Sequence, residues 1–219
     1  MEGDEIQAKL QMKVIKPEQI PHLLEPGEVG CTLEVTVTDK EGKVTNHRVQ
    51  KSQSFVRGFL ELLWINMKPV DEIDPYILMD IYGVPRGLGS TGMTFGCLAA
   101  IGDASKGIRV GTGTLAPDIN DIGLQTPIGH GTGVGQLQYS AVTFGAPASD
   151  PTTSQFTITR NFANASGGSI TVNEIGLQVR AHRQDSAYYF LTIRDVIAGG
   201  IVIPNGQTLT VNYRPQCVV

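Results

Sequence analysis

Alternation of apolar and polar residues across Gln155–Tyr213 constrains the fold of this chain more than any other feature of its sequence. At the start of this region Phe156, Ile158 and Phe162 occupy every second position, which is the period of a strand with one buried face. Arg160 is the polar exception on that apolar face. We therefore predict a strand here that carries one charged residue among its inward positions.

The same region contains further strand patterns, separated by turn sequences. Asn164–Gly168 and Asn205-Gly206 supply glycines that can adopt the positive φ of a tight reversal. The pattern predicts strands at Ser169–Val172, Ile175–Arg180, Tyr188–Ile197 and Thr208–Tyr213. Asn173-Glu174 interrupts the alternation, and we interpret it as a bulge or an edge. Short strands spaced about 8–12 residues apart with such turns predict an antiparallel sandwich or barrel.

The first residues carry the most regular alternation in the sequence. Apolar residues occupy Ile6, Ala8, Leu10, Met12 and Val14, and Gln or Lys separates them. One interpretation is an edge strand of the chain's own sheet, and the other is an arm that adds to a neighbouring subunit's sheet. Prolines between Lys16 and Glu28 predict an extended linker. We therefore divide the chain into an N-terminal arm and linker, residues 1–29, and one β-sandwich domain, residues 30–219.

Residues 30–66 are predicted to form a hairpin and a helix that pack on this domain. Two strands, one alternating and one mostly polar, flank a turn at Asp39–Gly42. Apolar residues then recur at three- and four-residue spacing up to about Asn66, at Phe55, Val56, Phe59, Leu60, Leu63 and Trp64. This spacing places an apolar stripe on one side of an amphipathic helix. We expect the stripe to plug the sandwich core; alternatively, the helix faces a partner with Trp64 as an interface anchor.

A glycine-rich region lies between this helix and the last strands. Gly111–Ala116 matches a loose form of the dinucleotide-binding pattern GxGxxA and follows a short predicted strand, Ile108–Val110. That pattern also requires a helix directly afterwards, but Pro117 follows instead. We expect no nucleotide and no other cofactor at these glycines. Val134–Phe144 is predicted to be a long strand that leads into the alternating region.

Composition and charge argue against several classes of function. The formal net charge is -4, whereas a nucleic-acid-binding protein normally carries a basic patch or stripe. The cysteines lack CxxC spacing and the histidines lack HExxH spacing, so the sequence predicts neither a zinc site nor a disulfide framework. No apolar run approaches the roughly 20 residues of a membrane span. We expect no enzyme activity, no catalytic residues, no bound metal, no nucleic-acid partner and no membrane contact.

Several stretches resemble a pattern found in structural proteins of tailed bacteriophages. They are Gly107–Gly113, Asp118–Leu124, Gly135–Tyr139, Phe156–Phe162, Asn164–Gly168, Ile170–Leu177, Arg194–Ile197 and Val202–Val211. The hairpin and the segment Ser54–Leu60 look similar too. The resemblance is one of strands and turns, and it brings no catalytic residues with it.

This resemblance implies a jelly-roll-like β-sandwich that works by assembly in the virion, after synthesis in the host cytoplasm. We therefore expect a capsid decoration or cement protein that clamps neighbouring capsid subunits as a symmetric trimer or dimer, with the major capsid protein as its partner. A tail, baseplate or fibre-base component is one alternative. A carbohydrate-binding β-sandwich module is another, which predicts glycan contacts through exposed aromatic side chains. The candidate interface residues are Ile6, Ala8, Leu10, Met12, Val14 and Trp64.

Overall fold

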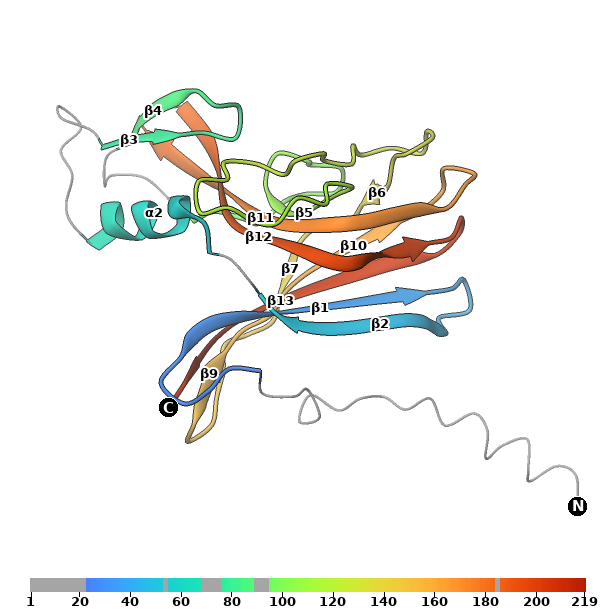
Figure 1. The fold of residues 1–219 in the computed structure, drawn as a ribbon, viewed down its shortest axis with the longest axis horizontal. Coiled ribbons are helices and arrows are strands. Elements are labelled where there is room, and N and C mark those ends of the chain that lie inside the picture. The colour runs from blue at the N-terminus through green and yellow to red at the C-terminus, as the bar shows by residue number, and fades with distance from the viewer. Residues whose placement is uncertain (1–22, 53–54, 68–75, 89–94, 184–185) are drawn as a thin grey trace, which may run out of the picture.

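A computed structural model describes residues 23–52, 55–67, 76–88, 95–183 and 186–219 (Figure 1). Within these residues the protein is mainly β, neighbouring strands are antiparallel, and α2 is the one helix. The predicted mainly β, antiparallel fold is therefore confirmed. The arm predicted at Ile6–Val14 lies outside the described residues.

The larger sheet contains eight of the described strands. Its order is β2–β1–β13–β10–β6, while β7 also pairs with β10 and a β8–β9 hairpin pairs with β13 through β9. The strands are β1 Val29–Thr38, β2 Val44–Lys51, β6 Gln138–Tyr139, β7 Thr143–Phe144, β8 Ala148–Ser149, β9 Thr153–Gln155, β10 Ile158–Ala163 and β13 Thr208–Val218. The predicted hairpin is β1–β2, and β1 pairs with β13 along its whole length, so the hairpin forms part of this sheet.

The smaller sheet contains three of the described strands, in the order β12–β11–β5. They are β5 Gly107–Gly111, β11 Ile170–Arg183 and β12 Ser186–Ile203. The register of β11 shifts between Val172 and Glu174, so the interruption predicted there is a bulge. The bulge keeps apolar side chains on one face, because the buried apolar residues fall at even positions before it (Ile170, Val172) and at odd positions after it (Ile175, Leu177, Val179).

The two sheets pack face to face as a sandwich (Figure 1). Their inward side chains form one apolar core, to which the larger sheet contributes Leu33 and Val211 and the smaller sheet contributes Ile175 and Ile193. A polar group also lies inside, because the buried Tyr213 hydroxyl donates a hydrogen bond of 2.8 Å to Asp195. The jelly-roll arrangement of the strands stays a prediction.

The outer edge of β12 is covered by several short contacts instead of by another strand. Phe55 forms a bridge with Ile193, and the Val56 amide donates to the Thr192 carbonyl. Farther along, the Arg48 guanidinium reaches from β2 and donates to the Ala198 carbonyl at 2.7 Å. Each contact occupies a backbone group that would otherwise be available to a foreign strand. The smaller sheet is therefore protected against edge-to-edge pairing in the part of β12 between Thr192 and Ala198.

Helix α2, Arg57–Met67, lies beside the hairpin of β3 Tyr76–Met79 and β4 Pro85–Leu88 at one end of the sandwich (Figure 1). The predicted apolar stripe is correct only at its start, where Val56 is buried and Phe55 packs against the core. Within α2 the buried residues are Leu62 and Ile65, whereas Leu60, Leu63 and Trp64 are exposed, so the helix is rotated relative to the prediction.

The reason for this rotation is a close approach at Gly58. A Cβ at Gly58 would lie 2.5 Å from the carbonyl oxygen of Leu191 on β12, so only a glycine fits there. This contact turns the Leu62 side of the helix toward the body of the protein and the Trp64 side away from it.

Arg160 on β10 is fully buried, and its guanidinium lies among backbone carbonyl groups. It donates hydrogen bonds of 2.6–3.1 Å to the carbonyl oxygens of Asp103, Lys106, Ile108 and Ser140. Burial lowers the pKa of Arg160 to about 10, so the side chain is still cationic at neutral pH. The charged side chain on the inward face of β10 therefore ties residues 103–108 and Ser140 to the larger sheet.

The long strand predicted at Val134–Phe144 is wrong, because only the short β6 and β7 form within it. Near its start, the Gln136 side-chain oxygen accepts a hydrogen bond of 3.0 Å from the Gly133 amide and closes a turn. Between β6 and β7, the Ser140 carbonyl points to Arg160 at 2.9 Å instead of to a neighbouring strand. These two side-chain contacts interrupt the extended chain.

Replacing Arg160 with Met is expected to lower the free energy of unfolding by about 3–5 kcal/mol, because several buried carbonyl groups lose their donor. Chemical denaturation followed by circular dichroism measures the change. Arg57→Met is the matched control, since Arg57 is 51% exposed and its pair with Glu61 contributes at most about 1 kcal/mol. Equal losses of stability in the two variants would contradict the role assigned to Arg160.

Asp103, whose carbonyl Arg160 binds, is expected to link stability to pH. Burial alone would raise the pKa of its carboxyl, but hydrogen bonds from Lys106 and Ser105 outweigh burial and lower that pKa to about 2. A depressed folded-state pKa stabilises the protein above the unfolded-state pKa of about 3.9, and this contribution is lost as the pH falls toward 2.

Asp103→Asn should therefore cost about 1–2 kcal/mol at pH 7 and reduce the loss of stability between about pH 5 and 2. Urea denaturation at a series of pH values tests this expectation. The same acid sensitivity in the variant and the parent protein would show that Asp103 is not responsible for it.

Candidate functional site

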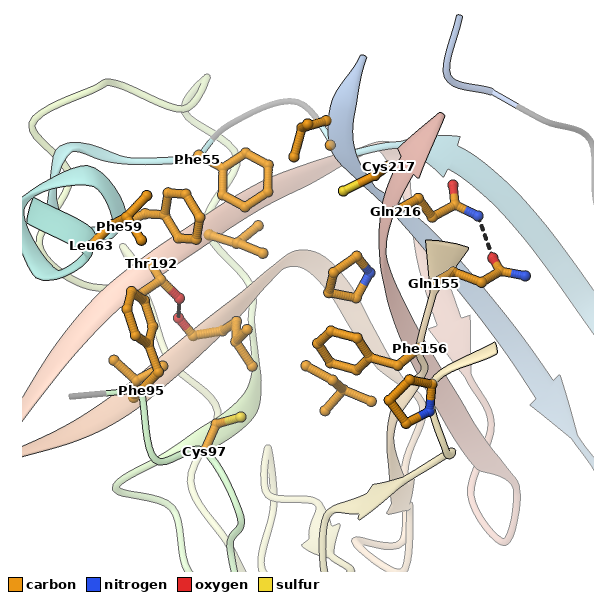
Figure 2. A pocket seen from close by; sticks show the side chains of 18 of the residues that line it. Phe55, Phe59, Leu63, Phe95, Cys97, Gln155, Phe156, Thr192, Gln216 and Cys217 are labelled. Atoms are coloured by element: carbon orange, nitrogen blue, oxygen red, sulfur yellow. Dashed lines mark hydrogen bonds between the residues drawn. The ribbon is translucent and has the colours of Figure 1, made fainter. Parts of the chain in front are cut away.

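An apolar cavity of about 470 Å³ lies between the two sheets at the end of the sandwich that carries α2. Figure 2 shows Phe55, Phe59 and Leu63 on one side of it and Phe156 and Cys217 on the opposite side. The floor comes from β11 and β12, through Leu177, Val179, Thr192 and Ile193. Segments far apart in the sequence therefore converge on one open hollow whose walls are hydrocarbon and aromatic rings.

Aromatic contacts hold one wall of the cavity in place. The ring centroids of Phe55 and Phe59 are 4.4 Å apart, and those of Phe59 and Phe95 are 5.8 Å apart. Aromatic pairs at such distances stabilise each other beyond the area that they bury. The wall therefore spans three separate parts of the chain: the approach to α2, the helix itself and the segment after β4.

The polar groups at the cavity use their hydrogen-bonding capacity within the protein. The Thr192 hydroxyl donates to the Leu177 carbonyl at 2.9 Å. The Gln216 amide donates to the side-chain oxygen of Gln155, and its own oxygen accepts from Thr32 at 3.0 Å. A molecule that enters the cavity therefore meets satisfied polar groups and a large apolar surface, which favours an apolar occupant.

The cysteines differ sharply in their surroundings. Cys217 is exposed at the cavity, whereas Cys31 and Cys97 are buried. Burial raises the pKa of the Cys97 thiol to about 11, and it raises that of the Cys31 thiol even further. Because the thiolate is the reactive form, the buried pair is chemically inert at neutral pH.

A second feature lies next to the cavity, on α2 and the β3–β4 hairpin. Seven large apolar side chains are exposed there, and we refer to them as the helix–hairpin patch: Leu60, Leu63, Trp64, Ile77, Met79, Tyr82 and Val84. Leu63 also lines the cavity, so the two features adjoin. Clusters of exposed apolar side chains of this kind mark interaction surfaces on soluble proteins.

Trp64 is the one predicted interface residue that falls within the described part of the chain. It is 41% exposed, and its ring lies 5.0 Å from that of Tyr76, centroid to centroid. The Tyr76 hydroxyl donates a hydrogen bond of 3.0 Å to Glu61, which holds the Tyr76 ring in place beside Trp64. The other predicted interface residues, Ile6, Ala8, Leu10, Met12 and Val14, lie outside the described residues.

The glycine pattern Gly111–Ala116 serves a buried carboxylate of the protein itself. Glu174, on the outer face of the smaller sheet, accepts hydrogen bonds from the backbone amides of Gly113, Gln125 and Thr126 at 2.7–3.2 Å. A Cβ at Gly111 or Gly113 would lie 2.4 or 2.6 Å from its oxygen Oε1. The glycines therefore make room for Glu174.

An arginine completes this network. Arg194 is buried, and its guanidinium binds Glu174 at 3.0 Å and Asp121 at 2.8 Å. The two carboxylates come from β11 and from the loop that covers the sheet. The network therefore fastens the loop to the outer face, so that both faces of the smaller sheet are covered.

Two structural features that other classes of protein use, a cluster of metal-ligating side chains and a membrane-spanning helix, are absent from the described residues. No group of three or more His, Cys, Asp and Glu side chains gathers there in a way that could hold a metal ion. The helix among those residues is too short to cross a bilayer. Comparison of the chain with protein-family models, with curated proteins and with solved structures gives no match.

The cavity predicts a difference in thiol reactivity. In dilute native protein we expect Cys217 to react with a thiol reagent at least about tenfold faster than Cys31 or Cys97, because it is exposed and they are not. Peptide mass spectrometry after brief alkylation measures all three rates. Cys217→Ser is the control and should remove the fast phase, and a fast phase that persists would contradict the assignment.

Proposed function

We propose that this chain is a structural protein of a tailed-phage virion, and specifically a capsid decoration or cement protein that clamps neighbouring capsid subunits. The single observation that carries the proposal is the helix–hairpin patch. Its side chains are 37% to 70% exposed, and they belong to α2 and the adjacent β3–β4 hairpin at one end of the sandwich (Figure 1). Such a surface is costly in water and becomes favourable when a partner protein covers it.

The patch has the composition of an interaction surface. It contains Trp64 and Tyr82, and aromatic side chains dominate the binding energy of many interfaces. Charged residues lie nearby, since Arg57 and Glu61 pair at 3.3 Å on the same helix. An apolar centre with polar groups beside it is the usual organisation of a specific protein contact.

The body behind the patch is suited to holding a partner rigidly. Arg160 and Glu174 each bind several backbone groups of the loops that surround the sheets. The covered edge of β12 reduces indiscriminate strand pairing, so association is directed to the patch. A clamp requires this combination, because a flexible body would lose the benefit of making several contacts at once.

The major capsid protein is the partner we propose, and the protein acts as a symmetric oligomer. In such an oligomer each copy presents the same patch, so modest contacts act together. A location in the tail or baseplate is the competing assignment. The number of copies per virion separates the two, because decoration of a shell requires hundreds of copies and a tail component far fewer.

The expected outcome is that Leu60→Asp and Trp64→Ala weaken binding to purified expanded capsid shells by roughly tenfold or more, since each removes an apolar contact worth about 1.5–3 kcal/mol. Co-sedimentation over a range of protein concentrations measures the affinity. Val134→Asp is the matched control, because Val134 is 95% exposed and lies outside the patch.

Quantitative mass spectrometry of virions and imaging of the bound protein complete the test. Binding to shells that depends on the patch, at high copy number, supports the proposal. Density confined to the tail, or shell binding that is equal in all variants, would refute it.

A further inference from the structure

We infer that the apolar cavity is a docking site for the N-terminal segment Ile6–Val14 of a second copy of this chain. The copies would exchange these segments and so join into a closed oligomer. The inference concerns the contact between copies, whereas the proposed function concerns the contact with the capsid, and the two use adjoining surfaces that meet at Leu63. It rests on the proposed function only in the premise that the chain assembles.

The cavity offers the chemistry that such a segment needs. It is lined by phenylalanine rings and aliphatic side chains, and its polar groups are already bonded within the protein. It opens to the surface beside Val29, an apolar side chain that is 78% exposed at the start of β1. An occupant that presents apolar side chains on one face and polar groups on the other would fill the cavity and still meet water at its mouth.

The N-terminal segment has this two-faced pattern. Its five apolar residues fall at every second position, and between them stand Gln7, Lys9, Gln11 and Lys13. In an extended chain the two sets point in opposite directions. One row can therefore enter the cavity while the amides and ammonium groups stay in water, as in other cases where an extended peptide binds through alternate side chains.

The path of the chain into β1 favours a second copy over the chain's own segment. The Cys31 side chain points into the sandwich. Because neighbouring positions of a strand face opposite sides of the sheet, a Cβ at Gly30 would point to the outer side. Leu24 packs at that position, 2.9 Å from where the Cβ would lie. The Gly27 amide, which donates to the Val218 carbonyl at 2.8 Å, fixes this approach. The chain thus enters β1 from the outer side of the larger sheet, whereas the cavity lies on the inner side of that sheet. To reach its own cavity, the N-terminal segment would have to turn back around the sheet edge.

The connecting residues give the segment a long reach from the start of the described chain. Ile15–His22 separates the segment from the first described residue, and at about 3.3–3.6 Å per residue it spans at most about 26–29 Å. Pro17 and Pro21 favour an extended path over a sharp return around the sheet edge. Exchange of an identical element between copies is a common route to closed, symmetric oligomers.

Cross-linking to Cys217 tests the contact directly, because this thiol is exposed at the cavity. Single variants Ala8→Cys, Leu10→Cys and Met12→Cys are placed on the apolar face, and Lys9→Cys and Gln11→Cys are matched controls on the polar face. Under mild oxidation of the purified full-length protein, we expect at least one apolar-face variant to form disulfide-linked oligomers about tenfold faster than the controls. Adding Cys217→Ser should abolish these products.

Other results of the cross-linking would overturn the inference. A disulfide within one chain would show that the segment docks in its own cavity and would overturn exchange between copies. Equal rates on both faces would overturn docking altogether. A small apolar molecule found in the cavity of the full-length protein by native mass spectrometry would also overturn it, because the segment could not then occupy that space.

Two further variants guard against failures of folding. Leu10→Asp should weaken self-association by roughly 10- to 100-fold in sedimentation equilibrium, whereas Gln11→Asp should leave it nearly unchanged. Deletion of residues 1–15 should dissociate the oligomer, leave the melting temperature of the monomer nearly unchanged and increase the reactivity of Cys217. A melting temperature that collapses on deletion would show that the segment belongs to the core of its own subunit, which contradicts the inference.

These measurements use the isolated protein and need no capsid. Loss of shell binding in the Trp64 variant with intact cross-linking would leave the exchange in place. Failure of the cross-linking with patch-dependent shell binding would remove the exchange and leave the proposed function in place.

Discussion

The fold depends on a buried positive charge that binds backbone carbonyl groups. Arg160 lies at an inward position of β10, where an apolar residue is expected, and binds carbonyl groups before β5, within β5 and directly after β6. A buried guanidinium is tolerated only when its donors are used. The loops that bring those carbonyls to it are therefore held as firmly as strands, although they have little regular secondary structure. On the smaller sheet, the buried carboxylate of Glu174 holds a loop in the corresponding way, by accepting hydrogen bonds from backbone amides.

Much of the fold follows from local sequence patterns. Alternation predicts β10 to β13, the Asp39–Gly42 turn predicts the β1–β2 hairpin, and the break at Asn173 predicts the bulge. What the patterns miss depends on contacts across the molecule. The rotation of α2 is set by the approach of Gly58 to β12, and the broken strand before β10 is set by the carbonyl that Arg160 binds. A glycine inside the helical pattern, Gly58, indicates a close approach, but a short window of sequence does not show which segment approaches it or which carbonyl groups Arg160 binds.

The same limit applies to the candidate site. Its phenylalanines come from positions as distant as Phe55, Phe95 and Phe156, and only the folded sheets bring them together. Trp64 was accessible to sequence analysis because a tryptophan in an amphipathic helix is conspicuous, although its exposure follows from the helix rotation. The cavity and the helix–hairpin patch adjoin at Leu63 but face different partners in the assembly we propose. One end of the molecule would thus hold both contacts.

The pairing of β1 with β13 also has a consequence for biosynthesis. These strands are separated by about 180 positions in sequence, yet β13 stands between β1 and β10 in the larger sheet. As the ribosome releases the chain, the early hairpin has no neighbour on that side until the last described strand emerges. Topologies with such distant partners fold slowly, and their unpaired intermediates are prone to aggregate. A nascent chain of this kind gains most from chaperones that shield the waiting edge of β1.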